Sequence, residues 1–351
     1  MTDMRKTLFA PGALALAVVA LAACSSTPSN AAATGTAGST QSTQSTQPSQ
    51  SSWPKQLTLA LIPNEQVNDL VTSAKPLTDY LSQQLGVTVT GVVTKDYQAA
   101  VEAVCAGQAQ IAIADAGSLA AAQDQCGAYP VLQDVRFGAS SYASEFFTNI
   151  AHASKYCTDA PVKATYAANG ASYLYCNGVA DGAKNTGVGP VAVDALKKIT
   201  PGTKVAFGNT TSPAGYQLPV LALESQGIKV DDLTQVPVTG NDNLVMAVYK
   251  GDAEVGFAYW DARSAVKASE APDLGDKVVV FGLSQMYPNG GVVLGRDLPA
   301  DLRAKITTLM AGYDKVDPTT LKNIFSQTAW VPADPAAIDV ARQVNKRFSG
   351  Q

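Results

Sequence analysis

The stretch "LTLALIP" at residues 57–63 opens the folded part of the chain, and the pattern that follows it decides the fold class. It is a short apolar run that ends at a proline, which is typical of a buried strand. The next stretch, "KPLTDYLSQQLG" (75–86), has leucines three and four residues apart and ends in glycine, which predicts an amphipathic helix. Two further strands at 87–94 and 109–115 enclose a second helix at 96–108. This β-α-β-α-β order predicts a mostly parallel α/β sheet.

The same alternation returns in the second half of the chain. Strands are expected at 203–208, 233–239, 253–260, 277–282 and 290–295, and helices at 191–199, 215–227, 242–251, 300–314 and 335–350. About 300 residues of this kind usually form two domains. Because no linker separates them, we expect lobes joined by crossing strands, with residues 53–140 and 258–351 in one lobe and 141–257 in the other. We therefore expect a ligand-binding cleft between the two lobes.

The first residues resemble an export signal. Arg5 and Lys6 precede the apolar run "LFAPGALALAVVALAA", which predicts a signal peptide over residues 1–23. The run is interrupted by Pro11 and is shorter than the roughly 18 to 20 residues of a membrane span. "LAAC" resembles the lipobox of bacterial lipoproteins, which implies that Cys24 is lipid-modified and anchors the chain to a membrane.

The residues between this cysteine and the fold predict a tether. Residues 25–52 are mostly Ser, Thr, Gln, Gly and Ala, with no large apolar side chain. Such a segment cannot bury enough surface to offset the entropy of ordering it. We therefore expect a disordered tether over residues 24–52 and folded structure from about Trp53.

Four other cysteines predict disulfides in an exported chain, and four thiols permit three pairings. We favour Cys105 with Cys126 and Cys157 with Cys176, because each pair closes a short loop worth about 3 kcal/mol. A metal site is the weaker alternative, since the chain has no CxxC spacing and one histidine.

The composition argues against several classes of function. The chain has 25 basic and 29 acidic residues, so it lacks the clustered positive charge that nucleic acids require. It has neither a G-x-S-x-G nucleophile motif nor a P-loop. We predict no catalytic residues, no cofactor, no metal and no nucleic-acid partner.

The stretch "NTTSPAGYQLP" (209–219) predicts an anion site at the start of a helix. The first backbone N–H groups of a helix have no intrahelical partner, and the helix dipole adds positive charge there. Thr211 and Ser212 add hydroxyl groups, and Gly215 permits close approach to the backbone. Ordinary helix capping by Ser212 is the alternative.

The order of motifs identifies a resemblance. "LALIPNE", "DYQAAVEAVCAGQAQIAIADAGSLAAA", "KVAFGNTTSPAGYQLP" and "VTGNDNLVMAVYKGDAEVGFAYWDA" follow one another within residues 57–306. Together they resemble the phosphate, phosphite and phosphonate-binding family of periplasmic substrate-binding proteins for ABC transporters. The resemblance implies the type II periplasmic-binding-protein fold, with two α/β lobes around a ligand cleft.

The resemblance also implies ligand-binding residues. The family pattern S-x-S-G-Y falls on Ser212 to Tyr216, with Ala214 at a position usually held by serine. A G-H-D pattern falls on "GND", so the neutral Asn241 replaces a histidine that can carry charge, next to Asp242. The remaining candidates follow or end strands: Asp261, Trp260, Tyr142, Ser118 and Asn64.

We therefore expect a monomeric, lipid-anchored, extracytoplasmic solute-binding protein that closes on a small anion or zwitterion and delivers it to an ABC permease. Phosphonate, phosphite and phosphate esters are the first candidates. 2-Aminoethylphosphonate is attractive because Asp242 and Asp261 could face its ammonium group. The alternatives are an organosulfonate or another organic solute, a sensor or interaction lipoprotein that kept the fold, and, last, a periplasmic enzyme.

Overall fold

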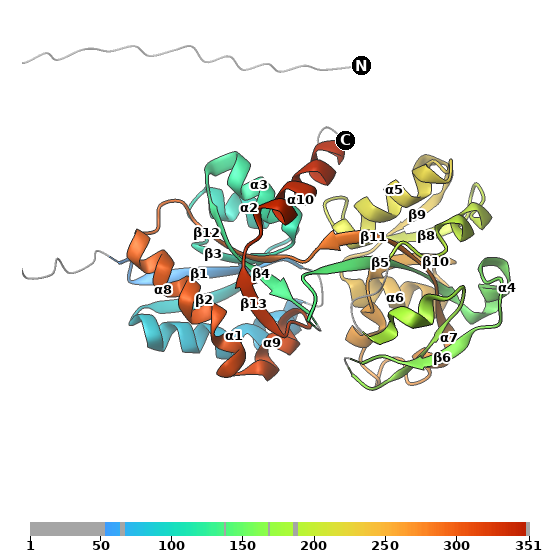
Figure 1. Cartoon of the computed structure of the whole chain (residues 1–351), viewed down its shortest axis with the longest axis horizontal. Helices are drawn as coiled ribbons and strands as arrows, with labels where there is room; N and C mark the ends of the chain where they lie inside the picture. Colours follow the sequence, from blue (N-terminus) through green and yellow to red (C-terminus); the bar gives the residue numbers. More distant parts are fainter. Residues whose placement is uncertain (1–52, 64–66, 137, 168, 185–188, 349–351) are drawn as a thin grey trace, which may run out of the picture. The chain divides into compact units, whose positions relative to one another are not determined.

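The computed structural model describes residues 53–63, 67–136, 138–167, 169–184 and 189–348 (Figure 1). The chain divides into residues 1–50 and residues 51–351. All structure described below belongs to the second unit, which contains two sheets. The predicted signal peptide, Cys24 and most of the tether lie outside the described residues, as does Asn64.

The first sheet has six strands in the order β13-β4-β12-β3-β1-β2. Its centre is formed by short apolar runs whose side chains are buried on both faces, as the "LTLALIP" pattern predicts. The strands are β1 (Gln56–Leu61), β2 (Thr88–Val93), β3 (Ile111–Ala114), β4 (Tyr129–Val135), β12 (Gly291–Leu294) and β13 (Ala329–Pro332).

Helices cover both faces of this sheet (Figure 1). On one side lie α1 (Val67–Leu85), α8 (Ala300–Ala311) and α9 (Pro318–Phe325), and on the other α2 (Tyr97–Cys105), α3 (Ala116–Cys126) and α10 (Pro335–Phe348). The leucines of α1 are buried against the sheet, as their spacing predicts. Gly86 ends this helix with φ of 68°, and its amide donates to the carbonyl of Ser82 at 3.0 Å.

The second sheet has seven strands in the order β6-β7-β11-β5-β10-β8-β9. Its strands are β5 (Ser141–Asn149), β6 (Val162–Thr165), β7 (Ser172–Tyr175), β8 (Lys204–Phe207), β9 (Thr234–Pro237), β10 (Val255–Tyr259) and β11 (Val278–Pro288). Both α5 (Leu218–Ser225) and α6 (Asn241–Lys250) pack against β5. The short α4 (Ala153–Tyr156) and α7 (Leu274–Lys277) complete the helices around this sheet.

The two-sheet α/β architecture agrees with the predicted fold class, but both sheets are mixed instead of mostly parallel. Two of the five strand pairs in the first sheet are parallel. In the second sheet three of six are parallel. The physical reason is that the chain crosses between the sheets at β4–β5 and at β11–β12, and in each sheet the two strands at these crossings pair antiparallel, β4 with β12 and β5 with β11.

The chain passes from the first sheet to the second between β4 and β5, and it returns between β11 and β12. The expected return at residue 258 falls inside β10, a strand of the second sheet, so the return lies later, after Pro288. The helix expected at residues 191–199 is a short 3-10 helix, Val193–Lys198, which follows Ala192 in a left-handed conformation.

Both predicted disulfides are confirmed. Cys105 is bonded to Cys126, and Cys157 is bonded to Cys176. The first joins α2 to α3, and the second joins the end of α4 to the end of β7. Among the described residues, no helix has both the length and the apolar character needed to cross a membrane.

Candidate functional site

Two cavities are lined both by residues around the first sheet and by residues around the second. The small cavity, of about 70 Å³, lies among the ends of β3, β4 and β10, the start of β5 and the starts of α3 and α6. The large cavity, of about 540 Å³, is lined by α2, α3, α10 and the segment 210–217. Tyr97 lines both cavities. The predicted oxyanion segment therefore divides its residues between two neighbouring spaces.

Ser212 and Ala214 line the small cavity, and Thr211 and Tyr216 line the large one. The segment enters a π-helical turn, Pro213–Gln217, which continues directly into α5. The Oγ of Ser212 accepts a hydrogen bond from the amide of Gly215 at 3.2 Å, so this serine does cap the turn. Its role toward a ligand stays a prediction.

Gly215 is buried, and its small size serves the packing of the backbone. Its carbonyl accepts a hydrogen bond from the amide of Gly208 at 2.9 Å. A Cβ atom at Gly215 would lie 3.2 Å from the Cα of Gly208 and 3.2 Å from the Oγ of Ser212. The glycine therefore lets the turn sit against the end of β8, whereas the sequence suggested a close approach to a ligand.

The other sequence candidates occupy different places. Asn241, the first residue of α6, lines the small cavity, and Asp242 is buried at the next position. Tyr142 of β5 also lines the small cavity. Ser118 lines the large cavity, where its Oγ donates to Asp115 at 2.5 Å. The structure thus brings Ser212, Ala214, Asn241 and Tyr142 together.

A buried arginine that was absent from the sequence candidates supplies the positive charge of the small cavity. Arg136 follows directly on β4, is 8% exposed, and lines the cavity. Its guanidinium lies 4.6 Å from the centre of the Tyr259 ring. Within the described part of the chain, its Nε and Nη2 have no hydrogen-bond partner. A buried guanidinium with unused donors is well suited to receive an anion.

Two carboxyl groups share this cavity with the arginine. Burial raises the pKa of Asp134 to about 7, although hydrogen bonds and the charge of Arg136 act in the opposite direction. The Oδ1 of Asp134 accepts from the indole Nε1 of Trp330 at 2.6 Å. Burial also raises the pKa of Asp115, which caps α3 by accepting from the amide of Ser118 at 3.1 Å.

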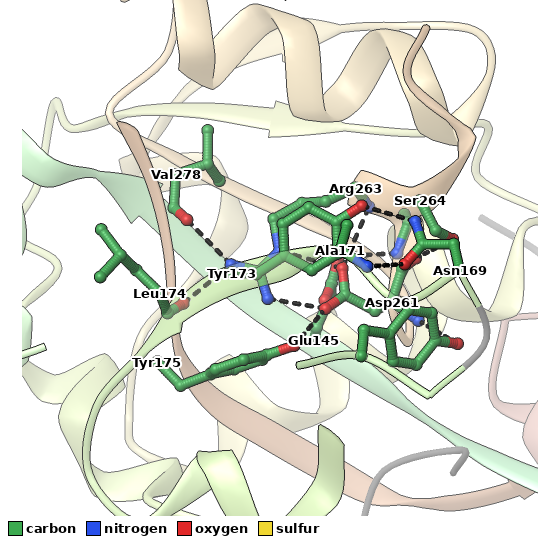
Figure 2. A network of polar contacts seen from close by, with 12 residues as sticks. Glu145, Asn169, Ala171, Tyr173, Leu174, Tyr175, Asp261, Arg263, Ser264 and Val278 are labelled. Atoms are coloured by element: carbon green, nitrogen blue, oxygen red, sulfur yellow. Dashed lines mark hydrogen bonds and ion pairs between the residues drawn. The ribbon is translucent and has the colours of Figure 1, made fainter. Parts of the chain in front are cut away.

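Asp261 is placed differently from the expectation of a carboxylate facing the ligand. Figure 2 shows its carboxylate held within a polar network of the second sheet. Oδ1 accepts from the Nε of Arg263 at 2.9 Å, and Oδ2 accepts from its Nη2 at 2.6 Å. Tyr175 also donates to Oδ2, at 2.9 Å. Both charged side chains are fully buried, so they satisfy each other within the protein.

Further contacts complete this network. The Nη1 of Arg263 donates to the carbonyls of Leu174 and Val278, at 2.8 Å each, and its guanidinium lies over the rings of Tyr173 and Tyr175 (Figure 2). Burial lowers the pKa of Arg263, but the charge of Asp261 outweighs this effect and leaves it raised. Burial, with the nearby charge of Asp261, raises the pKa of Glu145 well above its usual value.

Trp260 is also fully buried, and it packs among aromatic side chains of the second sheet. Its ring centre lies 5.5 Å from that of Tyr175 and 6.3 Å from that of Tyr166. Its backbone amide donates to the carbonyl of Ala143 at 3.1 Å. Trp260 and Asp261 together fix the end of β10, where Tyr259 lies beneath Arg136.

A model of the family described as "ABC transporter, phosphonate, periplasmic substrate-binding protein" matches residues 59–338. The chain belongs to this family. The phosphate-import protein PhnD of Mycolicibacterium smegmatis is 26% identical over 217 residues, which are 59% of this chain and 56% of that protein. The match therefore spans little more than half the length of that relative.

Solved structures show the same fold. A binding protein component of an ABC phosphonate transporter from Pseudomonas aeruginosa has a TM-score of 0.65 and 15% identity, over 84% of this chain and 86% of its own. PhnD1 from Prochlorococcus marinus in complex with methylphosphonate has a TM-score of 0.66 and 15% identity, over 85% of this chain and 99% of its own. The type II periplasmic-binding-protein fold is thereby confirmed.

In this binding protein, one sequence signal could have identified the missed residues. The segment "VLQDVRFG" ends in a charged pair two residues apart, and such residues lie on one face of a strand. Because ligands bind where strands of an α/β sheet end, Asp134 and Arg136 were candidates on position alone. Asn289, just after β11, also lines the small cavity and carried no comparable signal.

Proposed function

We propose that the protein captures a small phosphorus oxyanion (a phosphonate, phosphite or phosphate ester) in the small cavity and delivers it to the permease of an ABC importer. The observation that carries the proposal is the buried guanidinium of Arg136, with two nitrogens that have no partner among the described residues. A buried cation without a partner is costly, and an oxyanion would satisfy it through charge-assisted hydrogen bonds.

The surroundings of this cation favour an anion of limited size. The N-terminal residue of α6, Asn241, and the capped turn at Ser212 reach the same small cavity, so backbone dipoles add to the positive charge. Asn241 supplies a neutral amide, which leaves Arg136 as the cation that would meet the ligand. The names of the relatives, which refer to phosphate and methylphosphonate, support the same ligand class.

The position of the carboxyl groups changes the expectation for an amino-phosphonate. Asp261 is paired with Arg263 and does not line the small cavity, so it would not meet an ammonium group. Asp134 and Asp115 line that cavity instead. A ligand ammonium would therefore meet the carboxyl group of one of these two residues.

The proposal includes the route of export. The first 23 residues act as a signal peptide, Cys24 carries the lipid anchor, and the following segment tethers a monomeric binding domain outside the cell membrane. The sequence motifs described above support this part, together with membership of a periplasmic family. Binding, without catalysis, is the activity in this proposal.

The test is calorimetric titration of methylphosphonate, phosphite and phosphate into the wild type and into Arg136→Gln. Removing the cation takes away charge-assisted hydrogen bonds, so affinity should fall about 10- to 100-fold. Arg303→Gln is the matched control, because Arg303 also lies over a tyrosine ring, 4.2 Å from that of Tyr129, but lines neither cavity. Unchanged affinity in Arg136→Gln, or binding of neutral or cationic compounds alone, would contradict the proposal.

A further inference from the structure

The small cavity contains more negative than positive charge when its acids are ionised. Arg136 contributes one positive charge, and Asp115 and Asp134 contribute up to two negative charges. An anion placed in this cavity would meet two carboxylates of its own sign at short range. Such an arrangement binds an anion well only if a proton lies between the anion and a carboxylate.

Asp134 is better placed than Asp115 to share that proton. Both oxygens of Asp115 accept hydrogen bonds from Ser118, one from its amide and one from its Oγ. Asp134 accepts from Trp330 through Oδ1. The raised pKa of Asp134, about 7, is close to the second ionisation of phosphate groups, near about 6, so a proton is shared readily between the two.

A second acceptor lies in the same cavity. Asn289 is 3% exposed, and its Nδ2 donates to the carbonyls of Asp134 and Ala139 at 3.0 Å each. These bonds orient the amide, and its Oδ1 has no partner among the residues that the structure describes. The cavity therefore presents unused donors on Arg136 and an unused acceptor on Asn289. A ligand that both accepts and donates would satisfy them.

We propose that Asp134, assisted by Asn289, accepts a hydrogen bond from a P–OH group of the ligand, so that the site takes phosphorus oxyanions that retain a proton and rejects sulfonates and sulfate. This rests on the proposed function, because it concerns the same cavity. The second proton of phosphate groups ionises near about pH 6, so phosphonates and phosphate esters bring an exchangeable proton to the cavity. Sulfonates carry none and offer only acceptors, so when Asp134 is ionised they would face the oxygens of Asp134 and Asn289 without a hydrogen atom between them.

The experiment compares methylphosphonate with methanesulfonate, which differ in the central atom and in the exchangeable proton. Calorimetry at about pH 8, where Asp134 of the ligand-free protein is ionised, should show that the wild type prefers methylphosphonate by about 100-fold or more. Asp134→Asn should narrow this preference to about 10-fold or less, because an amide can donate to a sulfonate oxygen. The amide oxygen can still accept from Trp330, so the fold should be retained.

Two controls accompany the comparison. Asp317→Asn, at the cap of α9, changes a carboxylate that lines neither cavity and should leave the preference unchanged. In the wild type, affinity for methylphosphonate should fall as pH rises above about 7, when the shared proton is lost, and Asp134→Asn should show a flatter profile. The titratable groups that line the cavity with Asp134 are Arg136, Asp115, Tyr97, Tyr142 and Tyr259, and the side chains of Trp330 and Gln327 contact its carboxyl group.

The outcomes separate this inference from the proposed function. If the wild type binds both ligands equally, or if Asp134→Asn keeps the full preference, the shared proton is wrong while anion capture stands. If the wild type binds 2-aminoethylphosphonate but not methylphosphonate, Asp134 serves an ammonium group, and the inference also fails. If no phosphorus oxyanion binds, the proposed function itself fails.

Discussion

The sequence Asp-x-Arg lies at or just beyond the ends of two strands, β4 and β10, and the two pairs are used in opposite ways. In Asp261-Ala262-Arg263, after β10, the arginine folds back on the aspartate through two hydrogen bonds. In Asp134-Val135-Arg136, at the end of β4, the aspartate accepts from Trp330 and the arginine lies over Tyr259. The first pair is closed on itself, and the second leaves guanidinium nitrogens without a partner among the described residues.

The difference shows that sequence spacing does not determine what a charged pair does. The closed pair has neighbouring donors and acceptors for its charges, including Tyr175 and two backbone carbonyls. It can therefore stay buried without a ligand. The open pair lacks this compensation and is suited to a function that a ligand completes.

The largest expected effect is the difference in the free energy of unfolding between a variant of Arg263 and a variant of Arg136. Arg263→Met leaves the carboxylate of Asp261 buried without its cation, which should lower the free energy of unfolding by about 3 to 5 kcal/mol. Arg136→Gln should change it by less than about 1 kcal/mol, because few internal bonds are lost. Urea denaturation of both variants measures the difference.

The double variant Asp261→Asn with Arg263→Met is the control, since removing both charges should recover part of the lost stability. Similar losses for Arg263→Met and Arg136→Gln would show that the closed and open pairs are energetically alike.

An effect of similar size concerns the acid of the open pair. The pKa of Asp134 is raised from 3.8 to about 7 in the folded protein. The folded state therefore holds this proton more tightly than the unfolded state, and stability is lost as pH rises from about 4 to about 7. Asp134→Asn should remove this loss and stabilise the ligand-free protein at pH 8 by about 4 kcal/mol.

Thermal or urea denaturation of the ligand-free wild type and of Asp134→Asn, at about pH 4 and about pH 8, gives the measurement. Asp115 and Glu145 also have raised pKa values, so the quantity to follow is the difference between the two proteins. A difference that does not grow with pH would mean that Asp134 ionises as easily in the fold as in the unfolded chain.

The smallest effect tests one bond of the closed pair. Tyr175→Phe removes the hydrogen bond to the buried Asp261 but keeps the ring beneath Arg263, and should cost about 2 kcal/mol. Tyr173→Phe is matched to it, because Tyr173 also lies under Arg263 and accepts from Asn169. It should cost about 1 kcal/mol or less. Denaturation curves that rank the two variants in the reverse order would count against the closed network.

Much of the fold could be predicted from the sequence because its signals are local. The period of the leucines in α1, the glycine that ends it, and the apolar run of β1 each depend on a few neighbouring residues. The nine-residue strand β5 gave no such signal, because side chains on both of its faces are buried and its sequence, "SYASEFFTN", does not alternate. The mixed direction of the sheets depends on long-range pairing, which local patterns do not contain.

The candidate site was predicted only in part, for the same reason. Ser212 and Asn241 were found because helix starts have recognisable sequences, and the structure brings both to the small cavity. Asp261 was expected to face the ligand and is paired instead, and Arg136 was not among the candidates, because whether a charge is paired depends on residues far away in sequence. Tyr175 lies 86 residues from Asp261, and Trp330 lies 196 residues from Asp134.

The hydrogen bond between Trp330 and Asp134 also makes the protein its own optical reporter. The chain has three tryptophans, and the indole of Trp330 donates directly to the carboxyl group proposed to share the ligand's proton. Trp260 packs against the rings of Tyr175 and Tyr166 beside the closed pair and provides an internal reference. The fluorescence emission of Trp330 should therefore report the charge state of the buried Asp134 without an added label.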